Sequence, residues 1–232
     1  MKKIWLSVFV ILSVLHLAGI IGGVSLLSTL SKPMLMPVLA LWLMVQTPGD
    51  RSRLRTSWLF GLLFSMVGDV LLMYEGGFFF MSGLLAFLLA HLSYIVGTSS
   101  ALQGRRGFLE ANPGWIVPFL VYPAVMLYGL WDGIPEGMRA PVTMYALVIA
   151  TMAQSVVNLY GYIEKTVFRN LFAGAVLFVL SDSLLAVAKF GTPFTGDKVA
   201  IIASYMAGQW LLVKGVTALI TARKEPYRKA GK

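Results

Sequence analysis

Two aspartates stand inside long apolar stretches of the sequence, where charged side chains are rare. Asp69 lies in LFSMVGDVLLM and Asp182 in LFVLSDSLLAV, so each follows a small residue and is separated by one residue from a pair of leucines. Apolar surroundings and mutual repulsion favour a proton on at least one of two such carboxylates. The pair can therefore hold an acid and a base near neutral pH, as hydrolysis of an acid-labile bond requires. Two unrelated aspartates, each satisfied by neighbouring polar groups, are the alternative, but the cost of placing a carboxylate in lipid favours function.

Other polar side chains in the apolar stretches lie at helical spacing. Phe87, His91 and Tyr94 are four and three residues apart and share one helical face, and Tyr205 and Gln209 are one turn apart. His91 could move a proton, orient a carboxylate, or only pack. The Tyr205 phenol and the Gln209 amide could orient water or a head group, or could be hydrogen-bonding groups between helices.

Three basic side chains lie in or beside apolar stretches. Lys32 precedes the second stretch, where its ammonium group could reach the lipid head groups or bind a phosphate. Lys214 is about two turns from the end of the last stretch and is expected to extend to the membrane surface. His16 has no partner that the sequence identifies, and we expect it to pack.

The composition indicates that lipid is the main solvent of these elements. Hydrophobic residues make up 58% of the 232 residues and charged residues 12%, against roughly 45–50% and about 25% in soluble domains. The chain has no cysteine and two histidines, which excludes disulfides, thiolate metal sites and histidine-rich metal cages. We therefore expect no metal and no cofactor.

The apolar stretches predict an all-α, polytopic membrane protein. A helical span needs about 20 residues, and we predict a bundle of eight spans that forms a single transmembrane domain over residues 1–232. These spans cover about residues 4–27, 33–47, 57–74, 78–102, 115–131, 139–160, 170–188 and 199–221. The second span is the shortest, and Pro33 and Pro37 are expected in its first turn. Because it is short, we expect it to cross a thinned part of the membrane or to be tilted.

The basic residues predict the orientation. With both termini in the cytoplasm, fourteen of the nineteen Lys and Arg residues are cytoplasmic. Lys32, Arg139, Lys189 and Lys198 lie on the other side, and Lys214 lies within the last span. We therefore predict a multi-pass protein of the cell membrane whose basic charge reflects topology, with the lipid bilayer as a partner and no nucleic-acid partner.

The two aspartates are expected at one depth. The third and seventh spans run in the same direction, and each aspartate is about a dozen residues in, or roughly 18 Å from the inner end. Equal depth on helices four spans apart is consistent with a 4+4 parallel repeat. It also predicts that Asp69 and Asp182 meet across a cleft between these two spans.

Five segments resemble successive signatures of the YhhN family. They are Ser31-Lys32-Pro33, GDVLLM at 68–73, FLLAHLSY at 87–94, GAVLFVLSDS at 174–183 and SYMAGQ at 204–209. The resemblance runs from about residue 30 to 215 in the expected order. It implies lysoplasmalogenase activity, in which the vinyl-ether bond of a lysoplasmalogen, a lysophospholipid, is hydrolysed to a fatty aldehyde and a glycerophospho-head group.

The resemblance also implies the site residues. The implied positions are Lys32, Asp69, His91, Tyr94, Asp182, Tyr205 and Gln209. Within this set we infer catalytic roles for Asp69, Asp182 and His91 and substrate-binding roles for Lys32, Tyr94, Tyr205 and Gln209. A vinyl ether is hydrolysed through rate-limiting protonation of its β-carbon, and the hypothesis is that one aspartate delivers this proton while the other stabilises the oxocarbenium ion and activates water, as in glycosidases. The sequence does not say which aspartate is which.

Other function classes stay open at this point. A proton-coupled small-molecule transporter could use the two aspartates as a relay. An intramembrane aspartyl peptidase is disfavoured, because Met66 stands where its Gly-x-Gly-Asp motif needs the first glycine. A zinc-dependent lipid amidase would need more histidines, and a purely structural bundle would have little reason to keep two carboxylates at one depth. The head group, the chain length and the oligomeric state are not determined by the sequence.

Overall fold

The fold is entirely helical in the part of the chain that the structure describes. This structure is a computed structural model that describes residues 2–230, with side chains from 4 to 223. Its helices are α1 (Lys2–Ile21), α2 (Ser25–Gln46), α3 (Arg53–Leu71), α4 (Gly77–Ser100), α5 (Phe108–Ala111), η1 (Pro113–Ile116), α6 (Val117–Leu130), η2 (Trp131–Gly133), α7 (Glu136–Val157), α8 (Lys165–Phe190) and α9 (Asp197–Ala230). The all-α prediction is confirmed.

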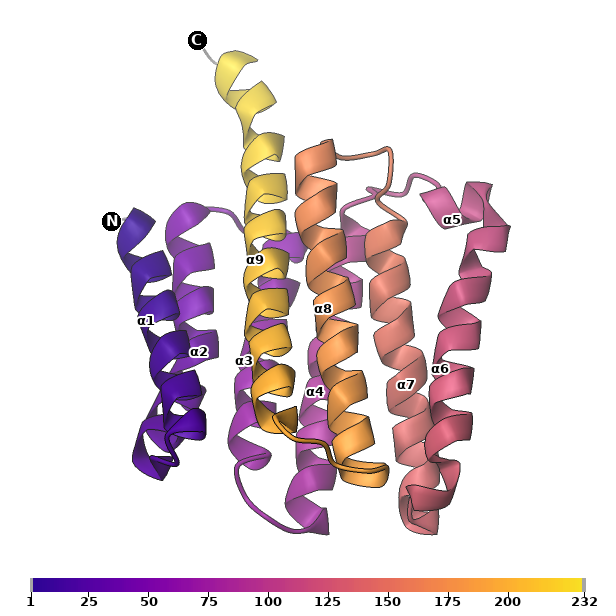
Figure 1. The fold of residues 1–232 in the computed structure, drawn as a ribbon. Coiled ribbons are helices and arrows are strands. Elements are labelled where there is room, and N and C mark those ends of the chain that lie inside the picture. The colour runs from indigo at the N-terminus through magenta and orange to yellow at the C-terminus, as the bar shows by residue number, and fades with distance from the viewer. Residues whose placement is uncertain (1, 231–232) are drawn as a thin grey trace.

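Eight segments are long and apolar enough to cross a membrane, as predicted. Seven are single helices, and the fifth runs from Pro113 to Gly133 through η1, α6 and η2. The protein is therefore a multi-pass membrane protein. Figure 1 shows the spans side by side as a bundle, with the start of α1 and the C-terminal end of α9 at the same end. This common end agrees with an even number of crossings, while its cytoplasmic position stays a prediction.

The second span is a full helix, and the prediction of a short span opened by prolines was wrong. α2 has 22 residues, and both Pro33 and Pro37 lie in its interior. Each proline removes one N–H···O=C bond from the helix, a loss that membrane helices tolerate because neighbouring helices and hydroxyl groups satisfy the freed backbone. Lys32 consequently lies well inside α2 rather than ahead of it.

Close contacts between helices depend on small residues. Gly174 of α8 and Gly208 of α9 face each other's backbones: a Cβ on Gly174 would lie 2.7 Å from the backbone N of Leu212, and one on Gly208 would lie 3.0 Å from that of Phe178. α3 and α4 approach in a similar way, because Gly97 accommodates the indole of Trp58. Without a hydrophobic driving force between helices in lipid, such close backbone packing holds the bundle together.

The helix starts determine the depth of the two aspartates. α3 begins at Arg53 and α8 at Lys165, four and five residues earlier than predicted, because basic side chains in the first turns can extend to the membrane surface. Asp69 is 16 residues beyond Arg53 and Asp182 is 17 beyond Lys165, or roughly 25 Å along each helix rather than 18 Å. Measured from the helix starts, the two positions match each other and both lie farther along than expected. Measured from the opposite helix ends they differ, because α3 ends two residues after Asp69 and α8 ends eight residues after Asp182.

Candidate active site

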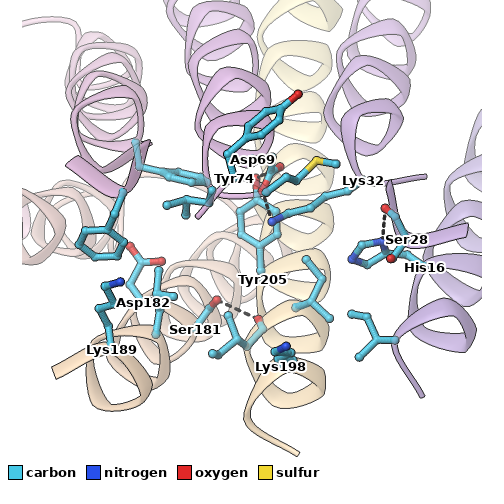
Figure 2. A pocket seen from close by; sticks show the side chains of 18 of the residues that line it. His16, Ser28, Lys32, Asp69, Tyr74, Ser181, Asp182, Lys189, Lys198 and Tyr205 are labelled. Atoms are coloured by element: carbon cyan, nitrogen blue, oxygen red, sulfur yellow. Dashed lines mark hydrogen bonds and ion pairs between the residues drawn. The ribbon is translucent and has the colours of Figure 1, made fainter. Parts of the chain in front are cut away.

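A polar cavity opens among the helices at the end of the bundle opposite the termini. Its volume is about 950 Å³. The polar side chains that line it come from α1, α2, α3, α8, α9 and the segment after α3, and they are His16, Ser28, Thr29, Lys32, Asp69, Tyr74, Glu75, Ser181, Asp182, Lys189, Lys198 and Tyr205. Figure 2 shows Asp69 beside Lys32 and Tyr205, with Asp182 on another part of the wall. The structure thus places both aspartates on one cavity.

Asp69 is held by a cation and a phenol. Its side chain is 4% exposed, and its Oδ1 lies 4.0 Å from the ammonium nitrogen of Lys32. The hydroxyl of Tyr205 donates to the Asp69 Oδ2 at 2.8 Å. Both contacts stabilise a negative charge on this carboxylate. The third turn of α2, the outer part of α3 and the third turn of α9 therefore combine to position one anionic group at the cavity.

Asp182 has a different set of partners. The hydroxyl of Tyr145 on α7 donates a hydrogen bond to the Asp182 Oδ2. His91 on α4 places its Nε2 3.4 Å from the same oxygen and 3.1 Å from the Tyr145 hydroxyl. The His91 ring is fully buried, and its Nδ1 has no hydrogen-bond partner within the described part of the chain. We infer that the ring proton lies on Nε2, facing Asp182, because a buried unpaired acceptor costs less than a buried unpaired donor.

Tyr145 was not identified from the sequence. Phenols in membrane spans are common packing and interfacial residues, and Tyr145 has no polar neighbour at helical spacing that would mark it. Its role depends on α7 packing against both α4 and α8. That arrangement, which is tertiary, brings the phenol to Asp182.

Tyr94 and Gln209 form a buried hydrogen-bonded layer that does not line the cavity. The Tyr94 hydroxyl donates to the Gln209 Oε1 at 3.0 Å, and the Gln209 Nε2 donates to the Ser65 Oγ at 3.1 Å. Both side chains are fully buried. They connect α3, α4 and α9 behind Asp69 and Tyr205. A substrate-binding role for these two side chains stays a prediction.

Three aromatic rings connect the two carboxylate environments. Phe87, Phe178 and Tyr205 pack edge to face, with centroid distances of 5.5 to 6.5 Å. Phe178 also contacts the His91 ring, at 4.8 Å between centroids. The same cluster therefore fixes the phenol that serves Asp69 and the imidazole that serves Asp182.

The two carboxylates face the same cavity without contacting each other. Among the described residues, no hydrogen bond joins Asp69 to Asp182, and each has its own donors. α3 and α8 both pack against α9, which separates them. The sharing of a proton between the two groups stays a prediction.

Two lysines at the mouth add positive charge that the sequence did not assign to the site. Lys189 at the end of α8 and Lys198 at the start of α9 line the cavity together with Lys32, and the Lys189 ammonium lies 4.8 Å from the centre of the Phe80 ring. From the sequence they appeared only as residues of the outer loops. The whole lining holds three lysines and three acidic side chains, Asp69, Glu75 and Asp182. Lys32 is paired with Asp69, and Lys189 and Lys198 are the cations at the mouth that are suited to an anion such as a phosphate.

His16, expected only to pack, also borders the cavity. Its Nδ1 lies 3.0 Å from the Ser31 Oγ and 3.1 Å from the Ser28 carbonyl, which orients the ring between α1 and α2. Within the described residues, no three His, Asp or Glu side chains gather closely enough to hold a metal ion. The polar groups that line the cavity are carboxylates, phenols, aliphatic hydroxyls, an imidazole and ammonium groups.

Comparison with known proteins identifies the family. The human lysoplasmalogenase TMEM86A (Homo sapiens) is 29% identical over 196 residues, which is 81% of this chain and 77% of that protein. The mouse lysoplasmalogenase TMEM86B (Mus musculus) is 30% identical over 184 residues, 78% of this chain and 71% of that protein. A lysoplasmalogenase of Mycobacterium tuberculosis is 30% identical over 156 residues, 66% of this chain and 58% of that protein.

No solved structure matches the chain. The model of the YhhN family matches residues 27–216, a range that contains Lys32, both aspartates and all the partners described for them. The chain belongs to the YhhN family.

Proposed function

We propose that this protein is a lysoplasmalogenase of the cell membrane, which hydrolyses the vinyl-ether bond of ethanolamine or choline lysoplasmalogens without a metal. The observation that carries the proposal is that two carboxylates with different partners, Asp69 buried and Asp182 partly buried, line one cavity of a membrane protein. The names of the relatives support the reaction class, and the cavity supports an acid–base mechanism.

In this mechanism Asp69 is the ionised carboxylate. The Lys32 ammonium and the Tyr205 hydroxyl both favour a negative charge on it. A fixed anion of this kind stabilises a cationic intermediate and can accept a proton from an attacking water molecule. Tyr205 positions the carboxylate, and the Gln209 and Tyr94 layer supports Tyr205 from behind.

Asp182 is the acid. Within the described side chains, no lysine lies within 4.0 Å of its carboxyl oxygens, and its partners are the Tyr145 phenol and the His91 imidazole. Because Oδ2 accepts from both partners, we assign the proton of the neutral carboxyl group to Oδ1, from which it can be donated to carbon. His91 and Tyr145 hold the group in the orientation that the transfer needs.

The proton balance closes with these roles. The Asp182 carboxyl protonates the β-carbon of the vinyl ether, which leaves an oxocarbenium ion and an ionised Asp182. Water attacks the cationic carbon and gives one proton to Asp69, forming a hemiacetal. As the carbon–oxygen bond to glycerol breaks, Asp69 returns its proton to the glycerol oxygen and the hemiacetal hydroxyl gives its proton to Asp182. The products are a fatty aldehyde and a glycerophospho-head group, and both carboxylates are restored.

The lysines at the mouth bind the head group. Lys189 and Lys198 lie where the cavity opens, and Lys32 lies deeper, beside Asp69. An ammonium group binds a phosphate as a point charge and does not select among ethanolamine, choline or other head groups. We therefore expect recognition of the phosphate to dominate.

The direct test is mass spectrometry of products from purified protein in micelles. A lysoplasmalogen and its saturated alkyl-ether analogue are supplied side by side. Aldehyde should be released from the vinyl ether alone, because a saturated ether has no carbon–carbon double bond that could accept a proton at the β-carbon. Cleavage of neither lipid, or of both, would contradict the proposed reaction, and flux of an unchanged solute across proteoliposomes would instead support the proton-coupled transporter.

A further inference from the structure

A second hollow, apolar in character, lies between α6, α7 and α8. This groove has a volume of about 80 Å³ and is lined mainly by aliphatic and aromatic side chains, among them Leu127, Ile149 and Val179. α6 forms one wall, and Pro123 is its only buried residue among those described. The groove is therefore covered on the lipid side by a loosely packed helix.

The groove and the polar cavity meet at one side chain. Asp182 is the residue that the two linings have in common. Tyr145, whose hydroxyl donates to Asp182, belongs to the wall of the groove. Asp69 lines the polar cavity but not the groove. The chemistry of the surroundings thus changes from polar to apolar across the Asp182 carboxyl group.

This juxtaposition matches a molecule with one polar part and one hydrocarbon chain. We propose that the groove receives the alkenyl chain of the substrate while the head group occupies the polar cavity, so that the groove residues determine the preference for chain length. The inference rests on the proposed function and adds a binding subsite to it. The groove is narrow, with less than a tenth of the volume of the polar cavity, so it encloses part of one hydrocarbon chain at most, and a lysophospholipid carries a single chain.

The groove also gives the chain a direction. It follows α8 from Ala186 past Asp182 to Val179, and α7 from Val142 past Tyr145 to Ala150. Both paths lead from the end that holds the mouth of the cavity toward the middle of the bundle. A chain placed along them runs toward the centre of the membrane, and burial of each methylene group contributes to binding.

This placement is consistent with the separate roles of the two carboxylates. The carbon that water attacks is bonded to the glycerol oxygen, and the β-carbon is the next carbon along the chain. In this placement the β-carbon lies on the groove side, next to Asp182. The glycerol oxygen and the attacking water lie on the polar side, which Asp69 lines. The carbon that must be protonated therefore meets the carboxyl group assigned as the acid.

Ala150 offers the test, because its small, buried side chain lines the groove beyond Tyr145. Ala150→Phe fills this part of the groove, and Ala150→Leu fills it partly. The neighbouring Thr151 is exposed on the lipid-facing side of the same helix, so Thr151→Phe is the matched control. Each full-length protein is purified in micelles and given an equimolar mixture of hexadecenyl and hexenyl lysoplasmalogens with the same head group.

The measured quantity is the ratio of hexadecanal to hexanal released in one tube, which does not depend on the folded fraction. We expect Ala150→Phe to lower this ratio about tenfold or more, as loss of burial of two methylene groups would. Ala150→Leu should lower the ratio by less, and it still tests the groove if the Phe variant fails to fold. Thr151→Phe should leave the ratio unchanged. An unchanged ratio in the Ala150 variants would overturn the groove assignment alone. Release of neither aldehyde by the unmodified protein would instead overturn the proposed function and this inference with it.

Discussion

At the scale of single residues, the site gives its two carboxylates different charged and hydrogen-bonding partners. Asp69 has an ammonium group and a phenol, whereas Asp182 has a phenol and an imidazole. Pairs of titratable groups with different environments can act as acid and base in one reaction. The arrangement is analogous to the carboxylate pair of glycosidases, which also proceed through oxocarbenium-like transition states.

Replacing either carboxylate should remove the chemistry and preserve the fold. We expect Asp69→Asn and Asp182→Asn each to lower the rate of aldehyde release by about a hundredfold or more, because an amide neither donates the proton nor carries the charge. The rate is measured on protein that elutes as a single species from a size-exclusion column. Asp197→Asn, at the partly exposed start of α9 and outside the cavity lining, is the matched control and should keep full activity. Full turnover in either active-site variant would remove that residue from the mechanism.

Tyr145 should act through Asp182. Tyr145→Phe keeps the ring that lines the groove and removes the hydroxyl that donates to Asp182. A hydrogen bond to a carboxylate contributes about 1.5–3 kcal/mol, so we expect kcat to fall about tenfold or more while KM changes little. Tyr128→Phe, on the exposed face of α6, should leave both constants unchanged. A rise in KM at constant kcat would show that Tyr145 binds substrate and does not position the acid.

At the scale of elements, the close packing of α8 against α9 connects the bundle to the site. α8 carries Asp182 and Phe178, and α9 carries Tyr205, so the separation of these two helices fixes all three. Gly174 and Gly208 permit the approach because any Cβ there would meet the opposite backbone. The continuous course of α3 and α8 also differs from the broken helices of many secondary transporters.

A side chain at this contact should destabilise the protein and disturb the site together. Gly208→Leu would push α9 away from Phe178, and we expect the free energy of unfolding to fall by about 1–3 kcal/mol, with a loss of activity. Thermal melting in detergent measures the first effect. Gly129→Leu, at an exposed position of α6 where a Cβ meets nothing within 4 Å, should have the same melting temperature as the unmodified protein. Equal melting of both variants would show that this contact does not hold the helices.

At the scale of the whole molecule, the distribution of charge gives the bundle two different ends. The cavity and its lysines lie at the end opposite the termini, and the Arg105–Arg106 segment and the first residues of α3 and α8 lie at the other. The excess of basic residues at the terminal end predicts that this end is cytoplasmic. The cavity would then open toward the outer face of the membrane.

Because the chain contains no cysteine, single cysteines can test this orientation without background. Thr195→Cys lies in the exposed loop between α8 and α9, and Arg106→Cys lies in the exposed segment after α4. In intact cells a membrane-impermeant maleimide should label the first variant, and the second only after the cells are permeabilised. The reverse pattern would invert the topology and place the cavity on the cytoplasmic side.

The sequence by itself determined the number of spans, the helical class and the residues that the surrounding apolar stretches mark as unusual. Hydrophobic length and the cost of a charge in lipid act along one helix, so the spans and both aspartates could be read directly. The prolines of α2 and the starts of α3 and α8 were misjudged, because tolerance of proline and of basic first turns depends on surroundings outside the helix.

Only the tertiary structure decided which polar groups meet. Tyr145 joins Asp182, Lys32 and Tyr205 join Asp69, and Gln209 and Tyr94 lie behind the cavity. These contacts join residues from 37 to 136 positions apart in the sequence. They follow from which helices pack together and at what rotation, which small residues such as Gly208 permit but spacing along the chain does not specify.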